Sequence, residues 1–197
     1  MKEIGFIGLG NMGSKMSVHL AKAGYNVSGF DIDYKLMDNL TEFGIKKVVS
    51  ISEISKNKDL IITMLPNGKI VNDVIREILE NSSNSPTIID CSTIDVNTSK
   101  NLYELALSNK IFLLDAPVSG GTIGALNGTL TFMVGGNKET FDKMLPVFDL
   151  MGSKAVFCGT AGSGQATKLC NNMLLAITMI GVGESFNMAK NFQLDLN

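Results

Sequence analysis

An amine and an amide stand four residues apart near the start of the last apolar segment of the chain, at Lys168 and Asn172. If this segment is helical, both side chains project from one face. Such a pair could meet one small polar substrate together. A lysine on a helix is more often a solvated surface charge, but the neighbours of Lys168 are mostly small or apolar. Partial desolvation would lower the pKa of its amine, as acid–base catalysis near neutral pH requires.

A second chemical signature lies near the beginning of the chain, where a GxGxxG pattern follows an apolar run and precedes a helical pattern. Its residues are Gly8, Leu9, Gly10, Asn11, Met12 and Gly13. In such a turn the first glycine permits the sharp bend, the second lets a pyrophosphate approach the backbone, and the third allows the helix to pack closely on the strand. The free N–H groups and the positive dipole at the start of the helix can hold the diphosphate. The strand–turn–helix context makes this pattern a strong prediction of dinucleotide binding.

A carboxylate at the end of the second predicted strand indicates which dinucleotide binds. Asp31 lies eighteen positions after Gly13. An acidic side chain there accepts hydrogen bonds from the adenosine ribose hydroxyls and repels a 2′-phosphate. No arginine lies near it, and Asp33 adds negative charge. We therefore predict NAD rather than NADP. The alternative for Asp31 is a turn role, and for Asp33 a solvated helix cap is the favoured role.

Two further strand ends carry candidate cofactor contacts, because ligands of open α/β sheets bind outside the carboxyl ends of the strands. Leu65 and Pro66 end the fourth predicted strand, and Thr93 follows the fifth. Capping of the next helix by Ser92 or Thr93 is an equally good explanation of that second segment.

A loop with two glycines follows a later strand end and predicts a carboxylate site. Ser119 offers a hydroxyl, and Gly120 and Gly121 can expose backbone N–H groups. Neutral donors in a concave backbone can grip a carboxylate without an arginine. Taken alone, the loop is better explained as a simple glycine turn before a helix.

Short apolar runs alternate with helical patterns, and these elements must position the groups above. The predicted strands are Glu3–Gly8, Val27–Asp31, Lys47–Ser50, Leu60–Leu65, Thr87–Cys91, Ile111–Asp115, Leu130–Val134 and Ala155–Cys158. The predicted helices are Asn11–Ala23, Tyr34–Phe43, Gly68–Leu79, Val96–Ser108, Lys138–Leu150 and Gly164–Lys190. Continuous Ile/Val/Leu strands favour a sheet covered on both faces, and strand–helix alternation favours right-handed βαβ units. We therefore expect an α/β protein with a Rossmann-type, doubly wound, mostly parallel sheet.

The chain is expected to divide near residue 163. The segment Thr160–Gly164 is small and flexible, and one helical pattern fills most of the remainder. We assign residues 1–163 to an NAD-binding domain and 164–197 to the start of an interdomain helix. Its most apolar stretch, Met173–Val182, is shorter than the ~20 residues that span a bilayer. An apolar stripe is predicted along Ala166, Leu169, Cys170, Met173, Leu174, Ile177 and Ile180.

Composition narrows the classes of function. The 197 residues carry a net charge of −2 with no long run of one sign, so no basic footprint suggests a nucleic-acid partner. The cysteines at 91, 158 and 170 are widely spaced, which fits small buried side chains in a reducing compartment. His19 is a poor catalytic candidate, and no cluster has metal-ligand spacing, so we expect no metal. No secretory signal precedes the first strand, which favours the cytoplasm, or the mitochondrial matrix if a presequence has been removed.

Taken together, the motifs resemble those of the β-hydroxyacid dehydrogenases, in the family's order across nearly the whole chain. The matching stretches are Gly5–Gly13 (GFIGLGNMG), Ile62–Pro66 (ITMLP), Asp90–Asp95 (DCSTID), Asp115–Gly121 (DAPVSGG), Leu130–Gly136 (LTFMVGG) and Gly164–Ile177 (GQATKLCNNMLLAI). The set is far more specific than any one motif.

The resemblance implies an NAD-dependent oxidation of 3-hydroxyisobutyrate, or a close 3-hydroxy acid, to its semialdehyde, as in valine catabolism. By the family pattern Lys168 is the acid–base residue and Asn172 orients the substrate. Its carboxylate would be bound by Ser119, Gly120 and Gly121, and the cofactor would be contacted by Leu65, Pro66 and Thr93. Family members continue into an all-helical domain that closes the site and builds most of a dimer interface. We expect a homodimer or higher oligomer where that domain is present, and no membrane partner.

Two other interpretations remain open. The substrate could instead be tartronate semialdehyde, as in related reductases. A non-catalytic NAD-binding fragment is the alternative from a different class, which the presence of Lys168 argues against and the short C-terminal part favours.

Overall fold

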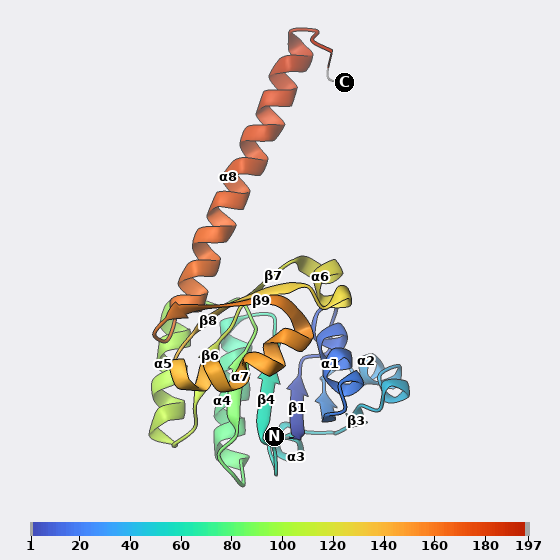
Figure 1. The fold of residues 1–197 in the computed structure, drawn as a ribbon, viewed down its shortest axis with the longest axis vertical. Helices are drawn as coiled ribbons and strands as arrows, with labels where there is room; N and C mark the ends of the chain where they lie inside the picture. The colour runs from blue at the N-terminus through green and yellow to red at the C-terminus, as the bar shows by residue number, and fades with distance from the viewer. Residues whose placement is uncertain (1, 196–197) are drawn as a thin grey trace.

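A parallel sheet with helices on both faces holds most of the chain, and one long helix rises from it (Figure 1). The computed structural model describes residues 2–195. The strands are β1 (Glu3–Ile7), β2 (Asn26–Phe30), β3 (Lys46–Lys47), β4 (Leu60–Thr63), β5 (Thr87–Asp90), β6 (Leu113–Asp115), β7 (Val118–Ser119), β8 (Leu130–Gly135) and β9 (Gly152–Gly159). The helices are α1 (Gly13–Lys22), α2 (Lys35–Asp38), a 3-10 turn (Thr41–Phe43), α3 (Ile51–Ile54), α4 (Gly68–Asn81), α5 (Val96–Ser108), α6 (Gly121–Asn127), α7 (Lys138–Met151) and α8 (Ser163–Asn191).

The strand order confirms the predicted doubly wound topology. The order β3-β2-β1-β4-β5-β6 is parallel throughout, and the chain reverses direction across the sheet between β1 and β4. Such a switch point leaves a crevice at the carboxyl ends of the strands, where dinucleotides bind. β6 and β7 pair antiparallel with one edge of β8, and β9 pairs parallel with the other.

Alternating side chains place a core on each face of the sheet. Ile62 and Ile89 pack in one buried cluster with α1 and α7, whereas the preceding residues, Ile61 and Ile88, pack in a second with α4 and α5. Successive side chains of a strand point to opposite faces, so apolar runs such as Leu60–Thr63 are required when both faces are covered.

Helix starts are fixed by local caps that the sequence contains. The side chain of Asn67 accepts from the Ile70 N–H at the start of α4, and that of Asn137 accepts from Thr140 at the start of α7. Most predicted elements are confirmed, with ends that move by a few residues. The exceptions are a predicted helix over Tyr34–Phe43, which is two short turns, and a predicted strand over Lys47–Ser50, which reduces to β3.

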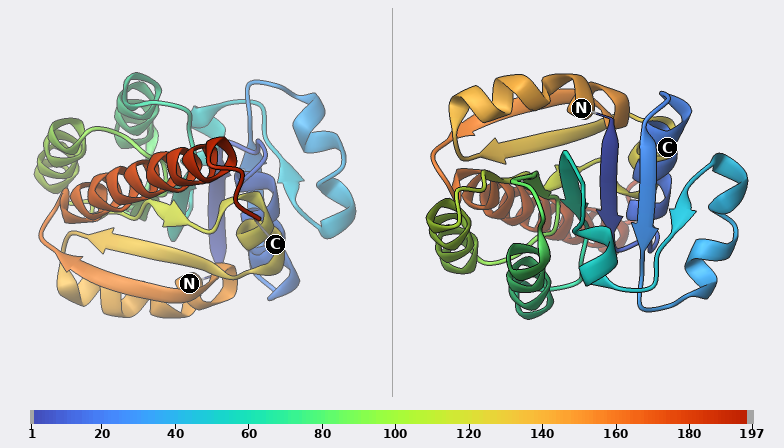
Figure 2. Two further views of the ribbon diagram at one scale, coloured as in Figure 1. Left: turned by 90° about the horizontal axis from the view of Figure 1, so that it is seen from above. Right: turned by 90° about the horizontal axis from the view of Figure 1, so that it is seen from below.

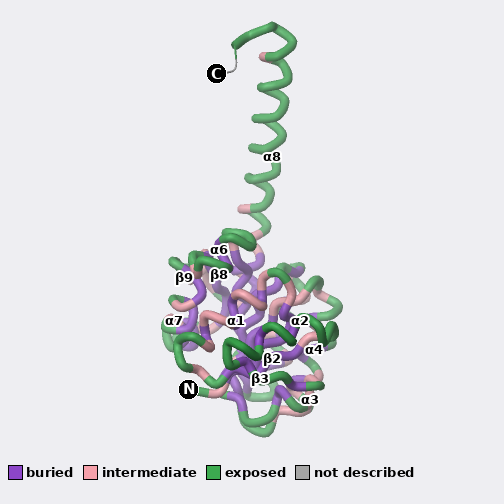
Figure 3. Tube along the Cα trace, turned by 90° about the vertical axis from the view of Figure 1, so that its right-hand side faces the viewer, coloured by how far each residue is buried: buried purple, intermediate pink, exposed green. Residues whose placement is uncertain are grey.

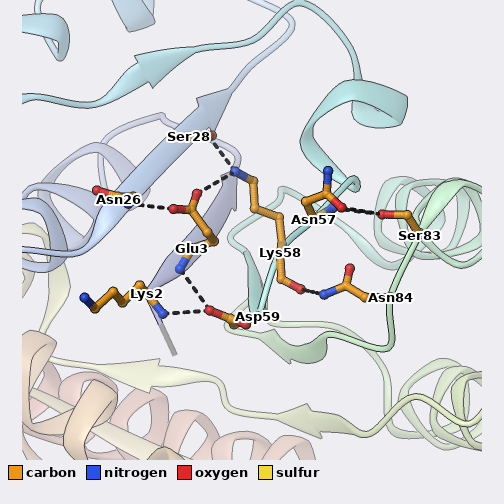
Figure 4. A network of polar contacts seen from close by, with 9 residues as sticks. All are labelled: Lys2, Glu3, Asn26, Ser28, Asn57, Lys58, Asp59, Ser83 and Asn84. Atoms are coloured by element: carbon orange, nitrogen blue, oxygen red, sulfur yellow. Dashed lines mark hydrogen bonds and ion pairs between the residues drawn. The ribbon is translucent and has the colours of Figure 1, made fainter.

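A polar network ties the amino ends of the central strands together (Figure 4). The buried Lys58 Nζ donates to Ser28 Oγ at 2.8 Å and lies 3.6 Å from Glu3 Oε2. The Asp59 carboxylate accepts from the backbone N–H groups of Lys2 and Glu3 at 2.7 and 3.1 Å, and these bonds lower the pKa of Asp59. β1 is therefore anchored to β2 and β4 at the end of the sheet opposite the crevice.

α8 leaves the sheet after its first turns, and its side chains are exposed along most of its length (Figure 3). Its apolar residues form two rows instead of the single predicted stripe. Leu169, Met173, Ile177 and Ile180 make one row, and Leu175, Met179, Val182 and Phe186 make another, each residue at least 49% exposed. A helix that is apolar on more than one side is normally covered on more than one side.

The length of α8 also corrects an expectation about membranes. The stretch Met173–Val182 is short, but the continuous helix Ser163–Asn191 is long and apolar enough to cross a bilayer by length and composition alone. A helix from the core of a soluble protein passes the same test. The nature of α8 must therefore be decided from what surrounds its first turns. Of the cysteines, only Cys91 is buried as predicted, while Cys158 is half-buried and Cys170 is exposed on α8.

Candidate functional site

A cleft of about 350 Å³ opens at the carboxyl ends of β1, β2 and β4, where the topology predicts it. Of the predicted cofactor residues, the cleft is lined by Gly8, Gly10, Asn11, Met12, Gly13, Asp31, Leu65 and Pro66. Apolar side chains around them include Ile32 and Ile51. Leu9 is buried beneath the cleft, and its N–H group is bonded to Asp31.

Each of the three glycines of the GxGxxG turn is accommodated for a different structural reason. Gly8 has φ +91°, and a Cβ there would overlap the carbonyl oxygen of Met64. A Cβ at Gly13 would overlap the carbonyl oxygen of Gly8, so this glycine lets α1 lie against the turn. At Gly10 a Cβ would meet nothing within 4 Å, so the chain itself does not require glycine there. An open backbone at Gly10 is what a bound pyrophosphate requires.

The start of α1 is suited to an anion. Within residues 2–195, no side chain caps its first turn, and that turn contains no acidic residue. The N–H groups at the N-terminus of a helix and its dipole favour a phosphate. The residues present therefore fit the diphosphate of a dinucleotide.

Asp31 lies at the mouth of the cleft with both carboxylate oxygens turned to the backbone. Oδ2 accepts from the Leu9 N–H at 2.7 Å, and Oδ1 accepts from the Asp33 N–H at 2.9 Å. These bonds fix the carboxylate and leave each oxygen with further acceptor capacity for ribose hydroxyls. Asp33 Oδ1 accepts in turn from the Lys35 N–H at 3.1 Å, although the N-cap position of α2 is held by Tyr34 and not, as predicted, by Asp33.

In the segment after β5, neither Ser92 nor Thr93 caps the next helix. Asp95 caps α5 by accepting from the Thr98 N–H at 2.8 Å, so capping by Ser92 or Thr93 is wrong. Ser92 is buried, and its Oγ accepts from the Leu65 N–H at 2.8 Å. Thr93 is exposed and lies outside the lining of the cleft.

Two buried carboxylates lie at the carboxyl ends of β5 and β6. Asp90 Oδ1 accepts from Thr63 Oγ1 at 2.8 Å and from the Ser92 N–H at 3.1 Å. Burial raises the pKa of Asp90 to about 6, against the lowering effect of its hydrogen bonds to Ser92 and Thr63. Burial likewise raises the pKa of Asp115, against the hydrogen bonds donated by Gly162 and Gln165.

Asp115 caps the start of α8 from a distant part of the chain. Its oxygens accept from the backbone N–H groups of Gly162 at 2.8 Å and Gln165 at 3.0 Å. Two glycines make room for the carboxylate, because a Cβ at Gly135 would lie 2.6 Å from Oδ1 and one at Gly164 would lie 2.8 Å from Oδ2. Sequence reasoning missed this role of Asp115. Its only signals were the glycines of the LTFMVGG and GQATKLC stretches.

Lys168 and Asn172 lie one turn apart on the continuous helix α8, as predicted. Lys168 is half-buried, and this burial lowers the pKa of its amine. Asn172 is exposed, and neither side chain lines the dinucleotide cleft.

The Ser119–Gly121 loop lies at the junction of β7 and α6. Gly120 and Gly121 have φ +126° and +61°, and both are exposed, while Ser119 is half-buried and paired with Thr131 of β8. Viewed from above, α8 begins beside α5 and only its far end projects toward α6 (Figure 2). A glycine turn before a helix, α6, is therefore confirmed.

The fold and cleft together define a dinucleotide-binding domain of the type found in oxidoreductases. Comparison with known proteins gives its family. A model described as the NAD binding domain of 6-phosphogluconate dehydrogenase matches residues 3–160. A model described as the NAD-binding of NADP-dependent 3-hydroxyisobutyrate dehydrogenase matches residues 162–197. The chain belongs to the β-hydroxyacid dehydrogenase family, with 3-hydroxyisobutyrate dehydrogenases among its matched relatives.

Individual relatives support this placement. The chain is 46% identical over 197 residues to 3-hydroxyisobutyrate dehydrogenase, mitochondrial, from Drosophila melanogaster, a match covering 100% of this chain and 61% of that protein. It is 40% identical to the NAD-dependent L-serine dehydrogenase of Pseudomonas aeruginosa, covering 94% of this chain and 63% of that protein. The solved 3-hydroxyisobutyrate dehydrogenase of Mycobacterium tuberculosis with L-serine superposes with a TM-score of 0.96 at 41% identity, covering 100% and 67%. The chain thus spans 61 to 66% of the length of the first curated relatives.

The different roles of Gly10 and Gly13 predict separable defects. Gly10→Ala should leave thermal stability unchanged but weaken NAD binding about tenfold or more, because its methyl group would stand where the pyrophosphate approaches. Gly13→Ala should lower the free energy of unfolding by roughly 1–3 kcal/mol, because the methyl group overlaps the backbone of Gly8. Calorimetric titration and thermal melting measure the two effects. Unchanged NAD affinity in a folded Gly10→Ala protein would contradict the proposed pyrophosphate position.

The buried carboxyl of Asp90 predicts a pH dependence of stability. Its folded pKa of about 6 lies above the usual 3.8, so the folded state favours the protonated form. The free energy of unfolding should therefore fall as pH rises through this interval, by on the order of 1–3 kcal/mol from this group. Asp90→Asn should remove that fall and be at least as stable as the parent at pH 7, as measured by urea denaturation from pH 4 to 8.

The control for Asp90 is Asp59→Asn, which should behave in the opposite way. The pKa of Asp59 is lowered by its backbone hydrogen bonds. Its contribution is therefore present above its usual pKa and is lost as pH falls through the folded value. If stability curves of Asp90→Asn and the parent run parallel across the whole range, the assignment of a raised pKa to Asp90 is wrong.

Proposed function

We propose that this chain is the cofactor-binding and lysine-bearing part of an NAD-dependent 3-hydroxyisobutyrate dehydrogenase. The observation that carries the proposal is Lys168, a half-buried amine with a lowered pKa, held at the carboxyl edge of a dinucleotide-binding sheet. The reaction would oxidise 3-hydroxyisobutyrate, or a close 3-hydroxy acid, to its semialdehyde. Relatives that carry this name match the chain over its full length.

The residues at the mouth of the cleft favour NAD over NADP. Asp31 presents a fixed carboxylate where an adenosine ribose would lie, and Ile32 beside it is 86% exposed and apolar. A 2′-phosphate would meet the charges of Asp31 and Asp33 with no arginine beside them. We therefore propose NAD, with contacts from Leu65, Pro66 and Thr93 added to those of the glycine turn.

The chemistry divides between the cofactor and the chain. When bound, NAD supplies the hydride acceptor. Lys168, in its neutral form, would accept the hydroxyl proton, and desolvation makes that form more available near neutral pH. Asn172, one turn further along α8, would orient the substrate, and the open N–H groups of Gly120 and Gly121 with the Ser119 hydroxyl would hold its carboxylate.

The division into a domain of residues 1–163 and a helical part of residues 164–197 is also proposed, supported by the sparse contact of α8 with the sheet beyond its first turns. The helix has the length of a membrane span, but its first turns carry Lys168 and are joined to the sheet by buried hydrogen bonds. These features favour an enzyme helix that other protein covers, in a homodimer or higher oligomer. We place the protein in the cytoplasm, or in the mitochondrial matrix.

Of three alternatives, one has specific support from the comparisons. A substrate of the L-serine type is favoured by a relative named for that activity and by a solved relative determined with L-serine. A tartronate-semialdehyde-type reductase would use the same lysine and loop. A non-catalytic NAD-binding fragment would retain the cleft alone.

The cofactor proposal predicts a measurable preference. The chain should bind NAD at least about tenfold more tightly than NADP in calorimetric titrations, and Asp31→Ala should reduce that ratio by weakening NAD binding. Equal affinities of the parent chain for the two dinucleotides would refute the role given to Asp31.

The lysine proposal predicts loss of turnover without loss of cofactor. Lys168→Ala and Lys168→Arg should lower NADH release from 3-hydroxyisobutyrate by roughly 10²–10⁴-fold, because neither offers a neutral amine. NAD affinity should stay nearly unchanged, because Lys168 lies outside the cleft. In the parent chain kcat/KM should rise with pH, with a midpoint below the usual range of lysine, because burial lowers the pKa.

The same assay separates the alternatives. Lys190→Ala, in the last turn of α8, is the matched control and should retain the parent rate. If L-serine or glycerate is turned over faster than 3-hydroxyisobutyrate, the faster-reacting acid is the substrate and the proposed one is wrong. NAD binding with no NADH release from any of the three acids would support the non-catalytic fragment.

A further inference from the structure

Gln165 occupies an unusual position for an uncharged polar side chain. It lies in the first turn of α8 and is fully buried, with 0% of its surface exposed. Its side-chain Oε1 accepts from the Ile94 N–H at 3.1 Å, and its Nε2 donates to the Ser92 carbonyl oxygen at 2.7 Å. A buried amide must satisfy its polar atoms, so these bonds fix the position of the side chain.

The two partners of Gln165 flank Thr93. The amide therefore holds the backbone on both sides of Thr93, much as a neighbouring strand would hold it. Ser92 in turn accepts from the Leu65 N–H through its Oγ. Hydrogen bonds thus connect the end of β4, the loop after β5 and the first turn of α8, which are the segments that carry Leu65, Thr93 and Lys168.

The same turn of α8 is the last part of that helix with buried residues, at Gly164 and Gln165. Lys168 follows Gln165 by three residues, which is close to one helical turn, so the two side chains lie on neighbouring parts of one face. Asp115 fixes the backbone of this turn, but its bonds reach only main-chain N–H groups and make no link to the Thr93 loop. Within residues 2–195, Gln165 is the only side chain whose hydrogen bonds join α8 to that loop.

We propose that Gln165 is a positioning residue that sets the Lys168 amine relative to the Thr93 loop and so to the cofactor. The inference rests on the proposed dehydrogenase function for its catalytic meaning. The structural part of the proposal is that the Gln165 side chain links the first turn of α8 to the Thr93 loop. We call this link the brace, and it can be tested without turnover. The amide is suited to this place because one side chain must donate to a carbonyl and accept from an N–H at once.

The test uses the full chain with two substitutions at Gln165. Gln165→Met keeps an unbranched side chain of similar size and removes both bonds. Gln165→Glu keeps the shape and the acceptor, but when ionised it turns a carboxylate toward the Ser92 carbonyl oxygen. When protonated, its hydroxyl can donate to that oxygen, so lowering the pH should restore the brace. Thr167→Val is the matched control, because the Thr167 hydroxyl bonds only within α8, to the Ser163 carbonyl oxygen.

Four kinds of measurement give the result: folding, the Lys168 titration, NAD affinity and turnover. Circular dichroism and thermal melting establish that each variant is folded. Acetylation of Lys168 by acetic anhydride, followed across pH by mass spectrometry, gives the titration of its amine. Calorimetry gives the NAD affinity, and kcat and KM for 3-hydroxyisobutyrate are measured where the chain turns over.

In folded Gln165→Met the acetylation midpoint of Lys168 should rise, because a loosened turn admits water and removes the desolvation that lowers its pKa. Turnover should fall roughly tenfold to a hundredfold in kcat with little change in KM for the acid. The ratio of kcat in Gln165→Glu to kcat in the parent at the same pH should be near one at low pH and should fall at high pH to the ratio found for Gln165→Met, and Thr167→Val should match the parent throughout. If Gln165→Met does not fold, Gln165→Glu across pH decides the question.

An unchanged Lys168 titration in folded Gln165 variants overturns the proposal, whatever the parent chain catalyses. The proposed function fails separately, if the parent releases no NADH or if Lys168→Ala retains its rate. A shifted Lys168 titration in a chain without turnover still supports the brace, because acetylation needs no substrate.

Discussion

The buried carboxylate of Asp115 is the constraint on which the rest of this site depends. It accepts hydrogen bonds from the start of α8, forty-seven and fifty residues later in the chain. Burial of a carboxylate is unfavourable, as its raised pKa shows, and the N–H donors at the positive end of the helix offset part of that cost. The arrangement is possible only because Gly135 and Gly164 leave space for the oxygens. This cap fixes the backbone of the first turn of α8, the helix that carries Lys168.

The cofactor cleft and Lys168 both lie at the carboxyl ends of the strands, but they need different surroundings. The cofactor cleft needs open backbone and a free helix start, which Gly10 and the uncapped first turn of α1 supply within the described chain. The lysine needs partial desolvation, which the packed first turns of α8 supply. Between them Asp90, Thr63 and Ser92 form a buried polar network that joins β4 to β5. Because each group is anchored to a different strand end, the sheet itself sets their relative positions.

The sequence predicts those parts of this arrangement that local patterns encode. Apolar runs and helical periods predicted the sheet and its large helices, and GxGxxG with Asp31 predicted the cleft. The short elements α3 and β7 were missed, because so few residues carry no period of their own, and α6 was anticipated only as the helix after the Ser119–Gly121 turn. Asp115 and Gln165 were missed for a different reason. Their partners lie from forty-seven to seventy-three residues away, and a lone Asp or Gln gives no sign of a partner at that separation.

The environment of Lys168 depends on what lies against α8. Its present burial comes from the first turns of the helix, while the two apolar rows that follow are exposed to solvent in the described structure. Water near the amine favours its charged form, so protein packed on the row of Leu169 and Met173 would desolvate Lys168 further. The pKa of the amine would then fall further in the same direction. Any protein that packed against the exposed apolar rows of α8 would therefore also change the pKa of the Lys168 amine.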